Sequence, residues 1–290
     1  MPNHTLTSVP GVEAGHWTHS SGTTGVTAVL CPQGARGAAV VVGAAPGSRE
    51  LGALQPSHLA GEVYGICLAG GSAYGLAAAD GVMEVLEARG VGFDTPYGPV
   101  PIVPAAILFD LHTAQARPDR SAGRHAAEAA GRGPLASGRV GAGAGARVGA
   151  LHGPSEPGGT GTSSAEIDGW TVGVVAAVNA GGSVYDPSAG RFVAGVTPGD
   201  SPGGGLLGTQ TTLVVVATDA PLSKAQLQVV ARMASAGLAR TLVPAFSPFD
   251  GDIVFALSTG TGAVDATAVC RVGARAAEQV AVAVLRAVGG

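Results

Sequence analysis

The segment between residues 206 and 219 constrains this chain more than any other. A loop rich in glycine and proline, residues 199–205, leads into two adjacent threonines, Thr211 and Thr212. An apolar run follows at once and is mostly β-branched. Such residues favour a pleated, buried surface, so we expect a strand over residues 211–218 that is covered on both faces.

A hydroxyl group at the first residue of such a strand has a second interpretation. If the chain were cut between Gln210 and Thr211, Thr211 would gain a free α-amino group with an ordinary pKa of about 7.7–8.0. That amine would serve as the base for its own Oγ, so no histidine would be needed. Two threonines before a valine run also occur in ordinary strands, and the local sequence leaves both interpretations open.

The composition indicates a compact protein with a large core. Of the 290 residues, 46% are hydrophobic and only 12% are charged, and the 48 glycines show no three-residue period, which excludes collagen. The net charge is −4 and Lys224 is the only lysine, so a nucleic-acid footprint is not expected. Low surface charge combined with many apolar residues favours a homo-oligomer.

The termini and the cysteines favour a cytoplasmic protein. The first residues contain no basic and apolar leader, and no apolar run approaches 18 residues, so neither a signal peptide nor a membrane span is expected. Cys31, Cys67 and Cys270 are few, odd in number and set in apolar runs. We expect all three to be reduced core residues.

Hydrophobic periodicity predicts strands and helices mixed along one domain, residues 1–290. The expected strands are residues 26–31, 38–43, 63–69, 170–178, 211–218 and 253–258. The expected helices are residues 73–89, 122–130, 223–238, with Ser223 as the N-cap, and 264–288. Residues 197–208 form the one break in composition, and we interpret them as a surface loop.

Three motifs that resemble cofactor or metal sites are interpreted structurally. The glycine-rich segment at residues 70–75 lacks the Gly-Lys-Ser/Thr ending of a phosphate loop and predicts a tight turn. The alternating glycines of residues 141–145 lack the dinucleotide spacing and predict a close approach of two backbones. His16 and His19 have no further ligand pair and predict a solvated loop. No cofactor and no metal are therefore expected, and without a Gly-x-Ser-x-Gly motif a Ser-His-Asp hydrolase is not expected either.

Two further positions carry polar groups at strand ends. Asp250 and Asp252 flank a glycine just before the apolar run 253–257, where carboxylates can hold an amine. Asp-Gly is equally typical of a turn. Asn179 follows another apolar run, where a buried amide can donate to an oxyanion or can form an Asx turn.

In joint order and spacing these segments resemble one family, the self-cleaving N-terminal-nucleophile amidases. Its members include the DmpA-type aminopeptidases, the β-peptidyl aminopeptidases and the nylon-oligomer hydrolase. The resemblance spans nearly the whole chain and rests on residues 9–12, 15–16, 43–50, 70–76, 79–82, 103–110, 140–143, 178–180, 211–220 and 248–252.

The resemblance implies a fold, an assembly and a set of site residues. The fold would be α/β, a four-layer αββα sandwich, assembled as a homotetramer. Thr211 would be the nucleophile, freed by cleavage after Gln210 into residues 1–210 and 211–290. Asn179 would match the family's oxyanion or substrate-amide asparagine, and Asp250 and Asp252 its carboxylate pair.

Departures from the family pattern fall near the expected pocket. Gln210 replaces an asparagine before the nucleophile, which is tolerable because the backbone carbonyl is attacked. Pro157 stands where many members carry a lysine, and Phe109 where some carry a tyrosine. We take Phe109, Pro157 and Tyr74 as possible pocket residues; losing one donor can slow catalysis about 100-fold.

The predicted function is a self-processing N-terminal-threonine amide hydrolase. Its substrates would be short peptides, β- or D-amino-acid amides, or ω-amino-acid oligomers of the nylon type. One alternative is an unprocessed, non-enzymatic protein that binds a small amine-bearing ligand, which the departures at Phe109 and Pro157 favour. Another is acyl transfer through the same acyl-enzyme, since an amine can intercept it as well as water.

Overall fold

Two β-sheets, packed face to face, form the centre of the molecule in a computed structural model that describes residues 3–113, 116–197 and 209–289. The long strand β2 (Gly25–Val41) belongs to both sheets, because its first half pairs with β4 and its second half with β14. The first sheet contains the start of β2 with β1 (Glu13–Thr18), β4 (Val63–Ala69), β5 (Ala105–Ile107) and β3 (Ser48–Arg49). The second contains the end of β2 with β14 (Ile253–Ser258), β12 (Thr211–Thr218), β9 (Trp170–Asn179) and β8 (Gly159–Ile167).

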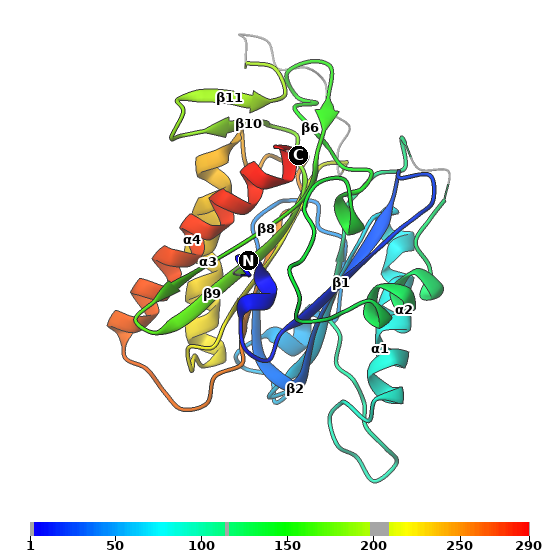
Figure 1. Cartoon of the computed structure of the whole chain (residues 1–290), viewed down its shortest axis with the longest axis vertical. Coiled ribbons are helices and arrows are strands. Elements are labelled where there is room, and N and C mark those ends of the chain that lie inside the picture. The colour runs from blue at the N-terminus through cyan, green and yellow to red at the C-terminus, as the bar shows by residue number, and fades with distance from the viewer. Residues whose placement is uncertain (1–2, 114–115, 198–208, 290) are drawn as a thin grey trace.

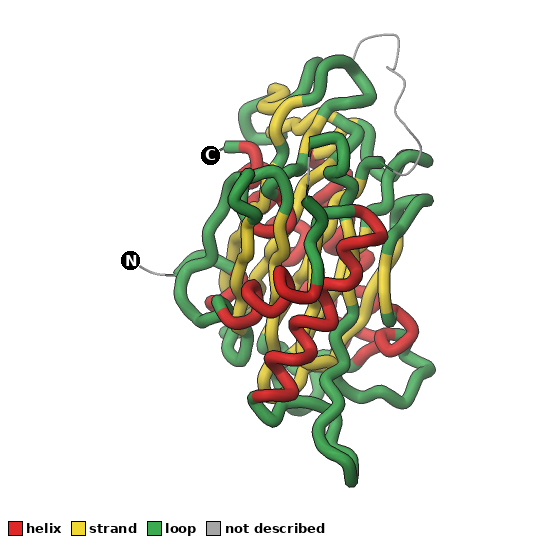
Figure 2. The backbone as a smooth tube through the Cα atoms, turned by 90° about the vertical axis from the view of Figure 1, so that its right-hand side faces the viewer, coloured by secondary structure: helices red, strands yellow, loops and turns green. Residues whose placement is uncertain are grey.

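Two pairs of helices cover the outer faces of the sheets. α1 (Ala78–Ala88) and α2 (Arg120–Glu128) cover the first sheet, and α3 (Lys224–Thr241) and α4 (Ala266–Val288) cover the second (Figure 1). Seen from the side of α1 and α2, the strands run roughly along the long axis of the molecule behind these helices (Figure 2). The order is therefore helices, sheet, sheet, helices, which confirms the predicted αββα sandwich.

Three apolar cores lie between the four layers. Leu68 of the first sheet and Val215 and Phe255 of the second lie in the core between the sheets. Val214 and Val216, the residues on either side of Val215 in β12, lie instead in the core under α3 and α4, as the two-residue period of a strand requires. β12 is thus buried on both faces, which explains why its sequence is continuously apolar.

The helices lie close to the ranges predicted from the sequence, with one local difference. Ser223 caps α3, its hydroxyl accepting from the Gln226 N–H while the Gln226 side chain accepts from the Ser223 N–H. α4 is capped by Asp265. The predicted helix at residues 73–89 begins instead as the 3₁₀ helix η3 (Ser72–Ala77), and only Ala78–Ala88 is α-helical.

Strand β8 was not predicted, because its sequence is small and polar rather than apolar. It nevertheless pairs with β9 at the edge of the second sheet and packs against α4. A Cβ at Gly161 would lie 1.9 Å from the Ala283 carbonyl oxygen of α4, so glycine is what allows the helix to approach. β1 was also not predicted, and the two runs expected at residues 26–31 and 38–43 are parts of the single strand β2.

Short elements complete the described chain. They are η1 (Leu6–Ser8), η2 (Leu51–Leu54), η4 (Gly141–Gly143), β6 (Arg147–Val148), β7 (Glu156–Pro157), β10 (Ser183–Asp186), β11 (Arg191–Ala194) and β13 (Leu242–Val243). Of the predicted loop at residues 197–208, all but the first residue lies outside the described residues.

Both glycine-rich motifs have the structural role predicted for them. In the turn after β4, Gly71 has a φ of +83°, and a Cβ at Gly75 would lie 1.9 Å from the Gly70 carbonyl oxygen. A Cβ at Gly145 would lie 1.9 Å from the Thr23 carbonyl oxygen. Each motif therefore marks a place where two stretches of backbone meet too closely for a side chain.

Two predictions about single residues were wrong. His16 lies within β1 rather than in a solvated loop, where its ring hydrogen-bonds the Thr27 hydroxyl and the Ala136 carbonyl. Cys31 and Cys67 are buried as expected, but Cys270 is exposed, because it lies on the outer side of α4. No helix among the described residues is long and apolar enough to cross a membrane.

Candidate active site

The start of β12 brings together the polar residues that the sequence placed at strand ends. β12 pairs with β9 on one side, where Thr211 lies opposite Asn179, and with β14 on the other. One residue earlier, Gln210 bridges Asp250. Thr211, Asn179 and the Asp250–Asp252 turn therefore meet at one end of the second sheet, near β6 and β10 at the top of Figure 1.

The Gln210–Thr211 peptide bond has a specific arrangement of hydrogen bonds. The Thr211 hydroxyl donates to the Gln210 carbonyl oxygen at 2.5 Å, and the Gly251 N–H donates to the same oxygen at 2.8 Å. Thr211 is only 3% exposed. The Thr211 hydroxyl thus touches the carbonyl group that self-cleavage would attack, and a backbone donor lies where negative charge would develop on that oxygen.

Asn179 is fully buried and its amide is held at both ends. Its Oδ1 accepts from the Arg147 N–H at 2.9 Å. Its Nδ2 donates to the carbonyl oxygens of Phe109 and Thr209, each at 3.2 Å. The amide N–H₂ therefore faces the residues just before Thr211, where a substrate carbonyl or an oxyanion would need a donor.

The two aspartates have different partners. Asp250 accepts from the Ser247 N–H at 2.8 Å, from the Ser247 hydroxyl at 2.5 Å and from the Gly181 N–H at 3.3 Å. Asp252 accepts from the Thr212 N–H at 2.5 Å. Burial, and after it the neighbouring charge of Asp250, raises the pKa of Asp252 to about 7.

This pKa makes the stability of the uncleaved chain depend on pH. An unfolded aspartate has a pKa of about 4, so between pH 4 and 7 the folded state retains a proton that the unfolded chain releases, and stability falls as the pH rises. Asparagine would keep the acceptor for Thr212 without titrating. In a Thr211→Ala background, we expect Asp252→Asn to gain about 2 to 3 kcal/mol over its parent between pH 5 and 8.

Urea unfolding of both proteins across this pH range would test the expectation. Asp119→Asn is the control, because Asp119 also accepts from a backbone N–H, that of Ala122, but is exposed as the N-cap of α2. Its effect should not vary with pH in this way. A pH-independent difference for Asp252→Asn would contradict a raised pKa at this site.

The three possible pocket residues differ in their relation to this cluster. Phe109 reaches it through its carbonyl, which accepts from Asn179, while its ring stacks on His112 with centroids 6.1 Å apart. Pro157 is exposed in β7 and pairs with Arg147 of β6. Tyr74 takes part in none of the contacts of the cluster; it is 57% exposed, and the Arg117 guanidinium lies 3.7 Å from its ring centroid.

Arg147 and the Gly251 N–H were not predicted as parts of the site. Arg147 orients Asn179 through its backbone, while its guanidinium donates to the hydroxyl and the carbonyl oxygen of Ser155. Partial burial and the charge of Arg147 both lower the pKa of His112, so this cation lies on the Phe109 side of the site. A single arginine in the glycine- and alanine-rich stretch 141–150 was the available signal.

Comparison with known proteins places this chain among peptidases. The model of Peptidase family S58 matches residues 4–289. An uncharacterized aminopeptidase of Mycobacterium tuberculosis is 43% identical over 98% of this chain and 93% of its own. A 6-aminohexanoate-oligomer endohydrolase of a Kocuria strain is 29% identical over 86% of this chain and 73% of its own. Among solved structures, the L-aminopeptidase D-Ala-esterase/amidase of Ochrobactrum anthropi, described as a variant of the Ntn hydrolase fold, superposes with a TM-score of 0.76, at 20% identity, over 99% of this chain and 86% of that one.

Proposed function

This chain belongs to peptidase family S58 and is a hydrolase of peptide or amide bonds, and we propose that its nucleophile is Thr211, made N-terminal by self-cleavage after Gln210. The observation that carries the proposal is the shared carbonyl oxygen of Gln210. It accepts from the Thr211 hydroxyl on one side and from the Gly251 N–H on the other. The Gly251 contact belongs to the parallel bridge between Gln210 and Asp250, whereas the contact of the Thr211 hydroxyl with the carbonyl of its own peptide bond is not part of the strand ladder.

Self-cleavage would proceed by an acyl shift within this peptide bond. Thr211 Oγ attacks the Gln210 carbonyl carbon, and the Gly251 N–H stabilises the oxyanion that forms on the carbonyl oxygen. The bond from this carbon to the Thr211 nitrogen then breaks, and the hydroxyl proton ends on that nitrogen. The resulting ester is hydrolysed by water, which leaves a carboxylate on Gln210 and restores the Thr211 hydroxyl.

The cleaved protein would use the same groups on a substrate. The free amine of Thr211 acts as the base for Oγ, which forms an acyl-enzyme with the substrate. Asn179 Nδ2 faces the space that the residues before Thr211 occupy in the uncut chain, so it would bind the substrate carbonyl. Asp252 already accepts from the N–H of the next residue, Thr212, and with Asp250 would orient the new amino group.

The position of β12 explains how both fragments would stay together. β12 begins residues 211–290, yet it is hydrogen-bonded over its whole length to β9 from the first fragment. Both of its faces are buried. The cut would therefore free a new chain end at the first residue of β12 and leave the strand pairing of the sheet intact.

The substrates proposed are short peptides, amino-acid amides and ω-amino-acid oligomers. The printed names of two relatives, an aminopeptidase and an oligomer endohydrolase, support this range. The site lacks two side-chain donors of the family pattern. Phe109 stands in place of a tyrosine and offers only its backbone carbonyl, and Pro157 stands in place of a lysine and has no side-chain donor. Arg147 supplies a cation on this side of the site instead, so the preferred substrate should differ from those of members that have both donors.

The intact mass of the purified protein under denaturing conditions tests the processing step. We expect two fragments, residues 1–210 and 211–290, and a new N-terminus at Thr211. The same preparation should release amine from at least one of an L-amino-acid amide, a β-amino-acid amide and a 6-aminohexanoate oligomer. A chain that stays uncut for days at neutral pH, or a cut elsewhere, would contradict Thr211 as the nucleophile.

A further inference from the structure

A cavity of about 580 Å³ lies at the end of the second sheet that is opposite to Thr211. It is formed where β12 and β14 end, and the loop after β14 that leads into α4 closes one side; this loop is orange at the lower edge of Figure 1. The eight residues of β12 separate it from Thr211 by roughly 20 Å. None of the residues around the Gln210–Thr211 bond lines it.

Three charged side chains line this cavity without forming an ion pair with one another. Arg36 lies opposite Ser258 in the β2–β14 register and donates to the Gly260 carbonyl, but it contacts no carboxylate among the described residues. Among the described residues, Glu62 has neither a hydrogen-bond partner nor an ion-pair partner. Asp219 accepts only from the Thr171 N–H, through Oδ1. One cation and two anions therefore face the same space with free bonding capacity.

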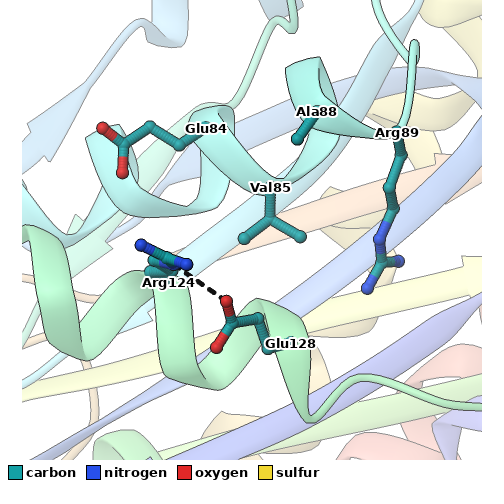
Figure 3. Close-up of a pocket in the computed structure, with 6 residues that line it drawn as sticks. All are labelled: Glu84, Val85, Ala88, Arg89, Arg124 and Glu128. Atoms are coloured by element: carbon teal, nitrogen blue, oxygen red, sulfur yellow. Dashed lines mark hydrogen bonds and ion pairs between the residues drawn. The ribbon is translucent and has the colours of Figure 1, made fainter.

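The cavity between α1 and α2 provides a contrast (Figure 3). It has a similar volume of about 530 Å³ and is also lined by charged residues. Its charges, however, are paired: Arg124 with Glu128 at 2.8 Å, Glu84 with Arg120, and Arg89 with Glu13 at 3.4 Å. The charged residues of the cavity between α1 and α2 form ion pairs, whereas those around Arg36 do not pair with one another.

We propose that the cavity around Arg36 binds a zwitterion, namely a free α-amino acid or a short peptide. The ligand carboxylate would pair with the guanidinium of Arg36, whose planar fork matches two carboxylate oxygens. The ligand ammonium would pair with Glu62 and Asp219. The volume lies within the range of small-ligand sites and admits a residue with a side chain.

The charge arrangement excludes simpler ligands. A lone anion such as phosphate would meet two carboxylates beside the single guanidinium. A lone metal cation would meet the guanidinium. A ligand that carries both charges can pair with all three side chains.

The site also fits the chemistry of the enzyme. Hydrolysis of a peptide releases a free amino acid or a shorter peptide, which is the proposed ligand class. This link to the reaction rests on the proposed function, whereas the binding itself depends only on Arg36, Glu62 and Asp219. The ligand would therefore bind as a product at a site remote from the nucleophile.

Isothermal titration calorimetry with L-leucine and L-serine tests the proposal, because neither contains an amide bond that the enzyme could hydrolyse. We expect one of them to bind with one site per chain, equally in the wild-type protein and in Thr211→Ala. Isoamylamine and 4-methylpentanoate, which each keep one charge of leucine, should bind at least about 10-fold more weakly than leucine. Arg36→Gln should weaken amino-acid binding by about 10-fold or more, and Glu62→Gln should weaken it several-fold.

Arg124→Gln is the control, because it removes a guanidinium from the other cavity and should leave binding unchanged. Thermal unfolding would establish that each variant is folded. The proposal is overturned if neither amino acid binds up to about 10 mM, if binding survives Arg36→Gln, or if it is lost in Thr211→Ala, which would place the ligand at the nucleophile. Processing and hydrolysis are measured separately, so their failure would count against the proposed function alone.

Discussion

The Thr211→Ala variant is expected to remain a single chain of 290 residues and to lose amide hydrolysis. Alanine removes the hydroxyl that touches the Gln210 carbonyl, so neither the acyl shift nor an acyl-enzyme can form. Loss of a covalent nucleophile lowers turnover by 10³-fold or more in enzymes of comparable mechanism, and roughly this loss is expected here. Intact mass and amide hydrolysis, measured on the same preparation, would show both effects.

Two neighbouring substitutions make this test specific. Thr211→Ser keeps a hydroxyl at the same place and should still be cut after Gln210. Thr212→Val changes the adjacent threonine, whose buried hydroxyl has no hydrogen-bond partner among the described residues, and should be cut as the wild type is. Because valine removes an unsatisfied polar group, its stability should be equal or higher. A cut in Thr211→Ala, or its loss in Thr212→Val, would count against Thr211 as the nucleophile.

The sequence predicts those parts of the fold in which hydrophobicity directs the chain. The expected strand at residues 211–218 and the Ser223 cap both occur where predicted. β8 was not predicted because glycine, threonine and serine carry little hydrophobic signal. It is specified instead by close backbone packing against α4, which becomes visible only when Ala283 is seen beside Gly161.

In the candidate site, too, some residues could be predicted from the sequence and others could not. Asn179, Asp250 and Asp252 stood out because polar residues at the ends of apolar runs meet at one edge of a sheet. The structure brings them together around Thr211. The Gly251 N–H is a backbone group without a side-chain signal, and Arg147 acts on Asn179 through its own N–H across 32 residues. Such contacts depend on the tertiary fold, while the substrate and the homotetramer stay predictions.

Gly251→Ala is expected to slow self-cleavage by about 100-fold or more, although it replaces none of the proposed catalytic side chains. A Cβ at this position would lie 2.8 Å from Thr211 Oγ1 and 2.5 Å from the Ala45 carbonyl oxygen. The Ala45 backbone is fixed by its N–H bond to the Asp250 carbonyl, at 2.9 Å, so residue 251 would have to move. That movement breaks the hydrogen bond from its N–H to the Gln210 carbonyl and displaces the nucleophile.

The time course of intact mass after synthesis would measure this rate. Gly131→Ala is the matched control, because nothing lies within 4 Å of a Cβ there, and it should be processed at the wild-type rate. Near-ultraviolet circular dichroism, with uncut Thr211→Ala as the reference, would separate a folded but unprocessed Gly251→Ala protein from a misfolded one. Wild-type processing in a folded Gly251→Ala protein would show that the Gly251 N–H does not stabilise the oxyanion, and another donor would then have to do so. If processing is slow while the fold is intact, the peptide bond before Thr211 is cut because this glycine lets a backbone donor and the hydroxyl approach one carbonyl oxygen.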